Sequence, residues 1–184
     1  MTTGAAFAGR AVVVTGGSTG FLGTNVARAL LDAGATVHAM SRAAAGRSFF
    51  PAGTARLVAH ETDLTRPVVL PDGIDTVFHC AAHTAGAHEM ATDPAAQVTP
   101  NAFMNSLVLE AAARQGVRRF VFVSSSAVYP RAEVPLTEAM GFAGDPPGNF
   151  FGPAWMKRYG EKTAEFCHRQ SGMGVAVIRP SNVY

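Results

Sequence analysis

A glycine-rich segment near the N-terminus has the residue types and spacing of a phosphate-binding loop. Residues 15–23 read Thr-Gly-Gly-Ser-Thr-Gly-Phe-Leu-Gly, directly after the β-branched run 11–14. Glycines let the backbone turn sharply, and a helix N-terminus offers free N–H groups to an anion. This context predicts a dinucleotide site, with an ordinary tight turn as the alternative. The residues expected to form the site are Gly16, Gly17, Ser18, Thr19, Gly20, Phe21 and Leu22.

Apolar runs alternate with helical patterns along the rest of the chain. The predicted strands are 11–14, 36–40, 56–59, 76–79, 120–123 and 175–178, and the predicted helices are 20–33, 94–115 and 153–170. Pro100 is expected to bend or restart the second helix, and 130–152 to form a long irregular loop. Such alternation implies parallel βαβ units. We therefore predict an α/β fold, a doubly wound parallel (Rossmann) sheet of strand order 3-2-1-4-5-6, as one domain over residues 1–184.

The residues at the end of the second predicted strand are expected to contact the ribose of the dinucleotide. In NAD-specific Rossmann folds an acidic residue at this place binds the ribose 2′-OH. Here the strand is followed by Ser41 and Arg42, with Arg47 close behind and no carboxylate. A guanidinium pairs well with a 2′-phosphate, so Ser41 and Arg42 are predicted to contact the cofactor and NADP is favoured over NAD. An ordinary surface arginine is the alternative.

The order of these motifs resembles that of the extended short-chain dehydrogenase/reductase family, of the NAD-dependent epimerase/dehydratase type. The loop resembles the family's Thr-Gly-Gly-x-Gly-Phe-Ile-Gly, with one additional residue, because both Ser18 and Thr19 precede Gly20. Residues 61–64 resemble the Asp-Leu pair beside the adenine, and 77–83, Val-Phe-His-Cys-Ala-Ala-His, resemble the motif after the fourth strand. The resemblance implies that the cofactor also contacts Asp63, Leu64, Cys80, Ala81 and Ala82.

The same resemblance implies hydride chemistry by a serine, a tyrosine and a lysine. Residues 123–129, Val-Ser-Ser-Ser-Ala-Val-Tyr, resemble the family's serine motif and imply Ser125 as its catalytic serine, with Ser126 as the alternative. Residues 151–161, Phe-Gly-Pro-Ala-Trp-Met-Lys-Arg-Tyr-Gly-Glu, resemble Gly-Tyr-x-Trp-x-Lys-Arg-x-Gly-Glu. The match implies that Lys157 is the catalytic lysine and also holds the nicotinamide ribose.

The tyrosine itself is where this sequence departs from the family. Pro153 stands four residues before Lys157, at the position of the acid/base phenol, although a proline is tolerated in the first turn of a helix. Tyr159 and Lys162 share a helix face and form the alternative catalytic pair. Tyr129, close to the serine motif, is another phenol that could reach the site.

Two functions follow from these matches. The first is an NAD(P)-dependent reductase or epimerase acting on a nucleotide sugar or related hydroxylated metabolite, with an atypical acid/base. The alternative is a catalytically impaired NAD(P)-binding subunit, or pseudoenzyme, completed by a second chain. Family members continue well beyond a motif like residues 179–184, so the resemblance implies that the C-terminal substrate lobe is missing. Ser126 and Ala127 stand where sugar-nucleotide 4,6-dehydratases have an Asp-Glu pair, which argues against that reaction.

Composition limits the partners. A net charge of +2 with scattered basic residues predicts no nucleic-acid partner. No apolar run is long enough for a membrane span, and the N-terminus does not resemble a signal peptide. Cys80, Cys167 and the six histidines lack metal-ligand spacing, so we expect no metal, no disulfide and a cytoplasmic protein. Helices over 101–115 and 153–170 resemble those that pair family members, which implies a homodimer or a complementing second chain.

Overall fold

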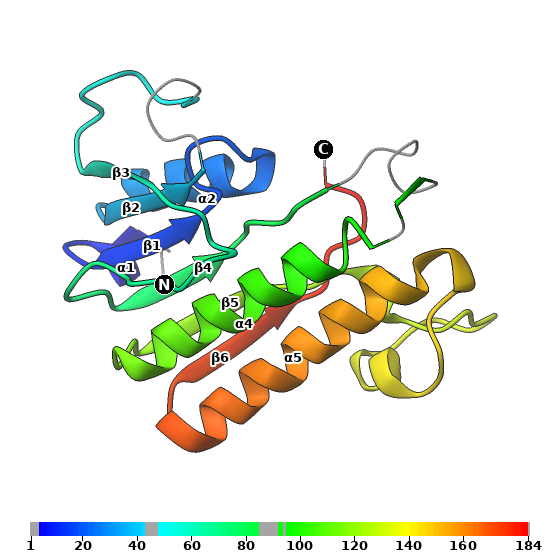
Figure 1. The fold of residues 1–184 in the computed structure, drawn as a ribbon. Coiled ribbons are helices and arrows are strands. Elements are labelled where there is room, and N and C mark those ends of the chain that lie inside the picture. The colour runs from blue at the N-terminus through cyan, green and yellow to red at the C-terminus, as the bar shows by residue number, and fades with distance from the viewer. Residues whose placement is uncertain (1–3, 43–47, 85–91, 94, 184) are drawn as a thin grey trace.

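The sheet of the computed structural model has the predicted topology. The structure describes residues 4–42, 48–84, 92–93 and 95–183. Six parallel strands are arranged in the order β3-β2-β1-β4-β5-β6 (Figure 1). This order confirms the doubly wound α/β fold, and it places the topological switch between β1 and β4. The strands are β1 (Ala11–Thr15), β2 (Thr36–Ser41), β3 (Leu57–Glu61), β4 (Thr76–His79), β5 (Arg119–Val123) and β6 (Gly174–Ile178).

The described α-helices lie on both sides of this sheet. They are α1 (Gly4–Phe7), α2 (Phe21–Asp32), α4 (Thr99–Arg114) and α5 (Phe151–Ser171). α2 packs on β1 and β2, whereas α4 and α5 lie side by side along the other half of the sheet (Figure 1). Pro100 is predicted to bend or restart the second helix, and the structure shows a start: α4 begins at Thr99 with the proline in its first turn. Residue 94, the predicted start of this helix, lies outside the described residues.

The long segment before α5 is less irregular than expected. It contains the short 3₁₀ helices η2 (Glu138–Phe142) and η3 (Gly148–Phe150), and η1 (Ser126–Val128) follows β5. These short helices are formed by local hydrogen bonds and have no hydrophobic periodicity, so they could not be predicted from the pattern of apolar residues.

The central strand β1 is covered on both faces. Val12, Val13 and Val14 are fully buried. Val13 belongs to the cluster under α4 and α5, and its two neighbours belong to the cluster under α2. A continuous valine run is the pattern expected of a parallel strand buried on both sides.

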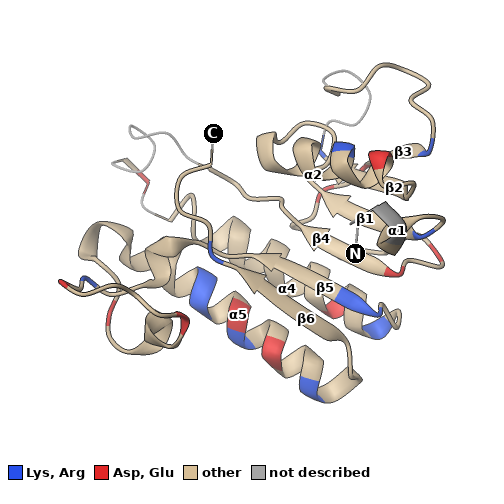
Figure 2. Cartoon of the chain, turned by 180° about the vertical axis from the view of Figure 1, so that it is seen from behind, with Lys and Arg blue, Asp and Glu red and all other residues tan. Residues whose placement is uncertain are grey.

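Charged side chains of both signs are spread over the molecule. Figure 2 shows them mixed along α5 and at the ends of the central strands. One group is the ion-pair cluster at Asp75, which Arg10, Arg118 and Arg119 approach within 2.7, 3.6 and 3.4 Å. Within the described ranges, no helix combines the length and the apolar character needed to span a bilayer.

Candidate functional site

The glycine-rich loop is built so that the N-terminus of α2 lies against it. Gly16 has a left-handed φ of +68°, which favours glycine. The amide of Gly20, the residue before α2, donates to the carbonyl of Gly16 over 3.0 Å. A Cβ at Gly23 would lie 2.4 Å from the same oxygen. The loop and the first turn of the helix therefore approach too closely for side chains, as an anion-binding loop requires.

Ser18, which was predicted to contact the cofactor, directs its side chain into the protein. Its side chain is fully buried, and its Oγ lies 2.5 Å from the Oγ of Ser41 at the end of β2. The carbonyl of Ser18 accepts a hydrogen bond of 2.9 Å from the amide of Phe49. Ser18 thus fastens the loop to β2 and to the segment after it. Burying this side chain accommodates the additional residue of the loop.

A cleft of about 770 Å³ opens beside the loop, at the carboxyl ends of the strands. This volume is in the usual range for sites of small molecules and cofactors. Gly17, Ser18 and Lys157 are not among the residues that line the cleft. The predicted cofactor residues that do line it are Gly16, Thr19, Gly20, Phe21, Leu22, Ser41, Arg42, Asp63, Leu64, Cys80, Ala81 and Ala82.

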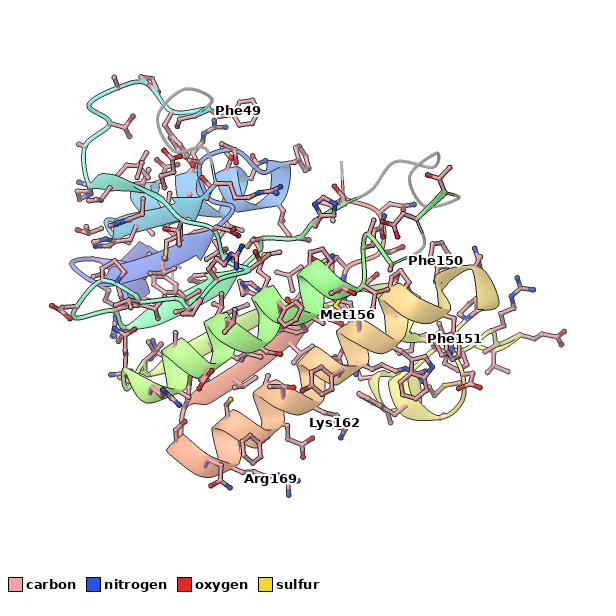
Figure 3. All side chains as sticks on the ribbon, in the orientation of Figure 1. Phe49, Phe150, Phe151, Met156, Lys162 and Arg169 are labelled. Atoms are coloured by element: carbon pink, nitrogen blue, oxygen red, sulfur yellow. The ribbon has the colours of Figure 1, made fainter. Side chains whose placement is uncertain are left out.

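Several cleft residues were not predicted. Phe49 exposes 64% of its surface at the end of the cleft that also holds Arg42 (Figure 3). Thr62 and Thr65 lie beside Asp63, and Met104 comes from α4. Their positions depend on where the loops after β2 and β3 return to the sheet, for which the sequence has no local signal.

The charged end of the cleft contains both an arginine and a carboxylate. Arg42 is exposed and lines the cleft, whereas Arg47 lies outside the described residues. Asp63 accepts hydrogen bonds from the hydroxyl of Thr65 at 2.7 Å and from its amide at 3.0 Å. These bonds lower the pKa of Asp63, with smaller contributions from Arg66 and Arg42. The end of β2 carries no carboxylate, but one from the loop after β3 faces the same region.

A buried chain of polar groups connects the strands at the floor of the site. His79 Nδ1 lies 2.9 Å from the hydroxyl of Thr15, and Nε2 lies 2.9 Å from Oδ1 of Asn105. Because Thr15 accepts from the amide of Ala81 and Asn105 donates to the sulfur of Met156, the bonds fit a neutral imidazole with its proton on Nε2. Burial lowers the pKa of His79 to about 4, which favours the same neutral form.

The segment after β4 is held over the cleft by α4. Asn101 accepts a hydrogen bond from the amide of His83 and donates one to its carbonyl, both at 2.8 Å. Cys80 is half-buried in this segment, and burial raises its thiol pKa to about 12. Cys80 therefore stays protonated, and both it and the buried Cys167 are free thiols.

The three serines after β5 have different environments. Ser124 is buried and donates to Oε1 of Glu161 over 2.5 Å. Ser125 is half-buried, and its Oγ accepts from the amide of Ala127 at the start of η1. This bond leaves the hydroxyl hydrogen of Ser125 available for another acceptor. The backbone amide of Ser126 donates to the carbonyl of Pro180.

Lys157 lies at the same end of the sheet as Ser125. Its Nζ donates to the carbonyl of Val123 over 2.8 Å and lies 5.3 Å from the centre of the Phe122 ring. Burial lowers the pKa of this amine to about 8. Pro153 is in the first turn of α5, one turn before Lys157, so the fold tolerates it as expected.

In the described chain, the hydrogen bond of the Lys157 amine goes to Val123 and not to a tyrosine. Tyr159 exposes 59% of its surface, because a residue two positions further along α5 points to the opposite side of the helix. Lys162, its alternative partner, is paired with Glu165 on the outer side of α5 (Figure 3). The hydroxyl of Tyr129 accepts from Arg179 over 3.1 Å.

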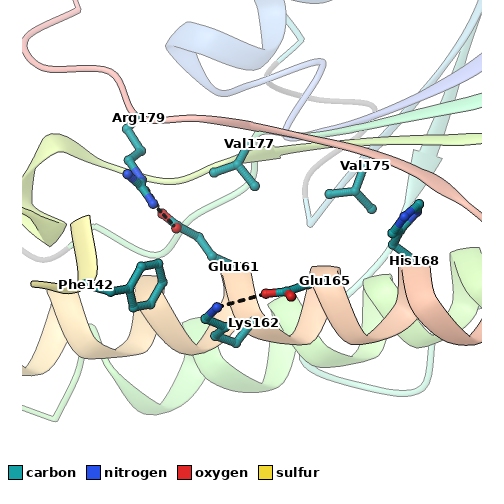
Figure 4. A pocket seen from close by; sticks show the side chains of 8 residues that line it. All are labelled: Phe142, Glu161, Lys162, Glu165, His168, Val175, Val177 and Arg179. Carbon is teal, nitrogen blue, oxygen red and sulfur yellow. Dashed lines mark hydrogen bonds and ion pairs between the residues drawn. The ribbon is translucent and has the colours of Figure 1, made fainter. Parts of the chain in front are cut away.

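Glu161 and Arg179 join α5 to the end of β6. The arginine Nε donates to Oε1 over 2.9 Å, and one terminal nitrogen donates to Oε2 over 2.6 Å (Figure 4). The other terminal nitrogen donates to the carbonyl of Glu138 over 2.7 Å. The pair lines a second, smaller cavity of about 340 Å³, together with Phe142, Lys162, Glu165, His168, Val175 and Val177.

A second arginine, Arg158, is almost completely buried. Its guanidinium donates to the carbonyl of Val128 at 3.0 and 2.6 Å and to that of Gly144 at 2.6 Å. It also lies 4.7 Å from the centre of the Trp155 ring. Arg158 therefore holds both ends of the segment that contains η2. Neither this contact nor the pair formed by Glu161 and Arg179 was predicted from the sequence.

The chain is similar to known proteins over nearly its whole length. Residues 12–184 match the NAD dependent epimerase/dehydratase family. A dTDP-4-dehydro-6-deoxy-D-allose reductase from a Streptomyces species is 32% identical over 97% of this chain. A 3 beta-hydroxysteroid dehydrogenase/Delta 5-->4-isomerase from Mycobacterium tuberculosis is 39% identical over 64% of it. The chain spans only 57% of the first relative and 32% of the second.

The fold is also similar to that of a solved structure. The epimerase Mth375 from Methanothermobacter thermautotrophicus matches 97% of this chain with a TM-score of 0.78 and 25% identity. The chain covers 53% of that protein. With the six-stranded sheet, the glycine-rich loop and the cleft beside it, these similarities show that the chain belongs to the NAD dependent epimerase/dehydratase family.

Proposed function

We propose that the chain is the dinucleotide-binding part of an NAD(P)-dependent reductase or epimerase. Its small-molecule substrate is a nucleotide sugar or a related hydroxylated metabolite. The observation that carries the proposal is the cleft that runs from Arg42, past Gly16, to Cys80. Its glycine loop suits a pyrophosphate. Lys157 lies near Cys80 and donates to Val123, two residues before Ser125. The relative that reduces a dTDP-sugar supports a nucleotide-sugar substrate, and the relative that acts on a hydroxysteroid supports the broader class of hydroxylated metabolites.

The test combines binding with turnover. The chain should bind NADPH and should oxidise it when dTDP-4-dehydro-6-deoxy-D-allose is added. Isothermal calorimetry measures the binding, and the absorbance of reduced nicotinamide measures the turnover. A chain that binds neither NAD(H) nor NADP(H) would contradict the proposal.

The alternative is a subunit that binds the dinucleotide without turnover, completed by a second chain. Pro153 favours it, because a proline ring has no proton to exchange at the place of the family's phenol. NADPH binding without oxidation of the cofactor, with turnover restored only by a second chain, would support this alternative.

We further propose that NADP is preferred over NAD, with Ser41 and Arg42 beside the 2′-phosphate. Arg42→Asp should lower the preference by roughly 1–3 kcal/mol, the range of a charge-assisted hydrogen bond. Calorimetry with both cofactors measures the difference. Arg114→Asp makes the same change of charge at the end of α4, paired with Glu110, and should leave the preference unchanged. Stronger binding of NAD by the unaltered chain would contradict the assignment.

We also propose that two copies associate through α4 and α5, or that the chain forms a complex with a second chain that supplies the substrate lobe. Each helix carries large exposed apolar side chains, Phe103 on α4 and Phe166 on α5, with exposed fractions of 57% and 60%. Exposed apolar surface of this kind favours association. Light scattering at micromolar concentration should give the mass of a dimer, and Phe166→Glu should shift it toward the monomer. An active monomer without a partner would contradict this prediction.

A reducing compartment such as the cytoplasm is part of the same proposal. Cys80 and Cys167 are both free thiols, and neither is paired. Free thiols persist where the cell keeps cysteines reduced.

A further inference from the structure

Lys157 brings a buried amine to the site, in which Pro153 stands in place of the family's tyrosine. We propose that the Nζ of Lys157 is itself the group that gives and takes the proton at the reacting oxygen. The inference rests on the proposed function, and it assigns the acid/base that Pro153 does not supply.

The chemistry requires such a group. When bound, a nicotinamide exchanges a hydride, which is two electrons and one proton, with a carbon of the substrate. The oxygen on that carbon must gain one more proton in a reduction and lose one in an oxidation. In a reduction the ammonium of Lys157 gives this proton and becomes a neutral amine, which then regains a proton from water. In an oxidation the neutral amine takes the proton and later releases it.

The other titratable groups around Lys157 are unsuited to this exchange. His79 on β4 is buried, with both ring nitrogens already bonded, to Thr15 and Asn105. The thiol of Cys80 holds its proton, because burial raises its pKa to about 12. On α5, Glu161 is occupied by its bonds with Arg179 and Ser124.

The tyrosines of the described chain are excluded by position. Tyr159 points to the outer side of α5, opposite Lys157. Tyr129 turns its hydroxyl toward Arg179, whose guanidinium also lies 5.1 Å from the centre of its ring. The phenol of Tyr159 is therefore directed away from Lys157, and the hydroxyl of Tyr129 is already bonded to Arg179.

Lys157 has the properties of a proton carrier. An ammonium group has three N–H donors, and in the described part of the chain its Nζ makes one hydrogen bond, to Val123. Because burial lowers the pKa to about 8, both the charged and the neutral form are populated near neutral pH. Ser125 follows two residues after Val123, and its free hydroxyl hydrogen can fix the oxygen that exchanges the proton.

The chain offers a direct test, because Lys157 and Lys162 are its only lysines. Lysine labelled with ¹³C at Cε gives two resonances, which Lys162→Arg assigns. A pH titration should show Lys157 changing near pH 8, with the exposed Lys162 as the internal reference. The proposal is overturned if Lys157 titrates above about pH 10, as an ordinary exposed lysine does. This measurement needs neither cofactor nor substrate, so it is independent of the proposed function.

The second test separates proton transfer from charge. Lys157→Arg keeps a positive charge and hydrogen-bond donors, but a guanidinium does not deprotonate in a protein. Turnover of the dTDP-keto-sugar at saturating NADPH should fall by roughly 10²–10⁴-fold, and NADPH affinity, measured separately, reports any effect on the ribose contact. Lys162→Arg, the same change on the outer side of α5, should leave both unchanged.

Each other outcome has a definite meaning. Retained turnover in Lys157→Arg overturns the proposal, because charge alone would then suffice. Lost turnover in Lys162→Arg overturns it in favour of the pair with Tyr159. Binding of NADPH without any turnover by the unaltered chain also overturns it, in favour of the non-catalytic alternative. Absence of NADPH binding contradicts the proposed function itself.

Discussion

Glu161→Ala should lower the free energy of unfolding by roughly 3–5 kcal/mol, the cost of removing one partner of a buried ion pair. The Glu161 side chain is 5% exposed and that of Arg179 is 15% exposed. The substitution leaves the guanidinium without its carboxylate and the Ser124 hydroxyl without its acceptor. Urea denaturation followed by circular dichroism measures the change.

Glu165→Ala is the matched control, because it lies one turn further along the same helix. Glu165 pairs with Lys162 and Arg169, whose side chains are largely exposed, and such surface pairs contribute little. The double variant Glu161→Met, Arg179→Met should recover most of the loss, since apolar side chains of similar size often replace a buried pair without cost. Equal effects of the two alanine substitutions would show that the buried pair is no more important than a surface pair.

The protein should also lose stability as the pH falls from about 6.5 to about 4. The folded state keeps His79 neutral with a pKa of about 4, whereas the ordinary value is 6.5. Between these values the unfolded chain binds a proton that the folded chain does not, so stability is complete above pH 6.5 and decreases toward pH 4. The difference corresponds to about 3 kcal/mol for one histidine. Urea denaturation at half-unit pH steps measures it.

The control isolates His79 from the other titrating groups. Burial, with a smaller contribution from His60, also lowers the pKa of His38. His38 therefore adds to the loss of folding stability as the pH falls. Carboxylates with lowered pKa values, such as Asp75, lose their contribution only at more acidic pH. His79→Gln should be less stable at pH 7 but should show a flatter profile between pH 4.5 and 6.5. An unchanged slope in this variant would mean that His79 is protonated in the folded protein.

The fold could be predicted because its signals are local. Several strands are short β-branched or aromatic runs, such as the valines of β1 and Phe-Val-Phe-Val in β5, and they lie next to turns or helical patterns. The parallel order then follows from the handedness of the crossovers. The predicted strand ends differ by a residue or two from the observed ones, as at β3, which begins at Leu57 and extends to Glu61.

The site could be predicted only where a motif is continuous in sequence. The glycine loop and the segment at Cys80 lie beside the cleft, because each follows a strand directly. The burial of Ser18 could not be foreseen, since its partner Ser41 is 23 residues away. The same holds for Arg158, which bonds to carbonyls 30 and 14 residues away. Contacts of this kind leave no periodicity in the sequence.

The buried Arg158 and the half-buried Arg179 hold the segment before α5 through its backbone. Arg158 binds the carbonyls of Val128 and Gly144, and Arg179 binds that of Glu138. Every amino acid carries such a carbonyl, and residues 131–139 between the anchors are exposed. The path of this loop is thus encoded mainly outside it, so its side chains are free to diverge during evolution, or to be randomised in a library, while the backbone keeps its course.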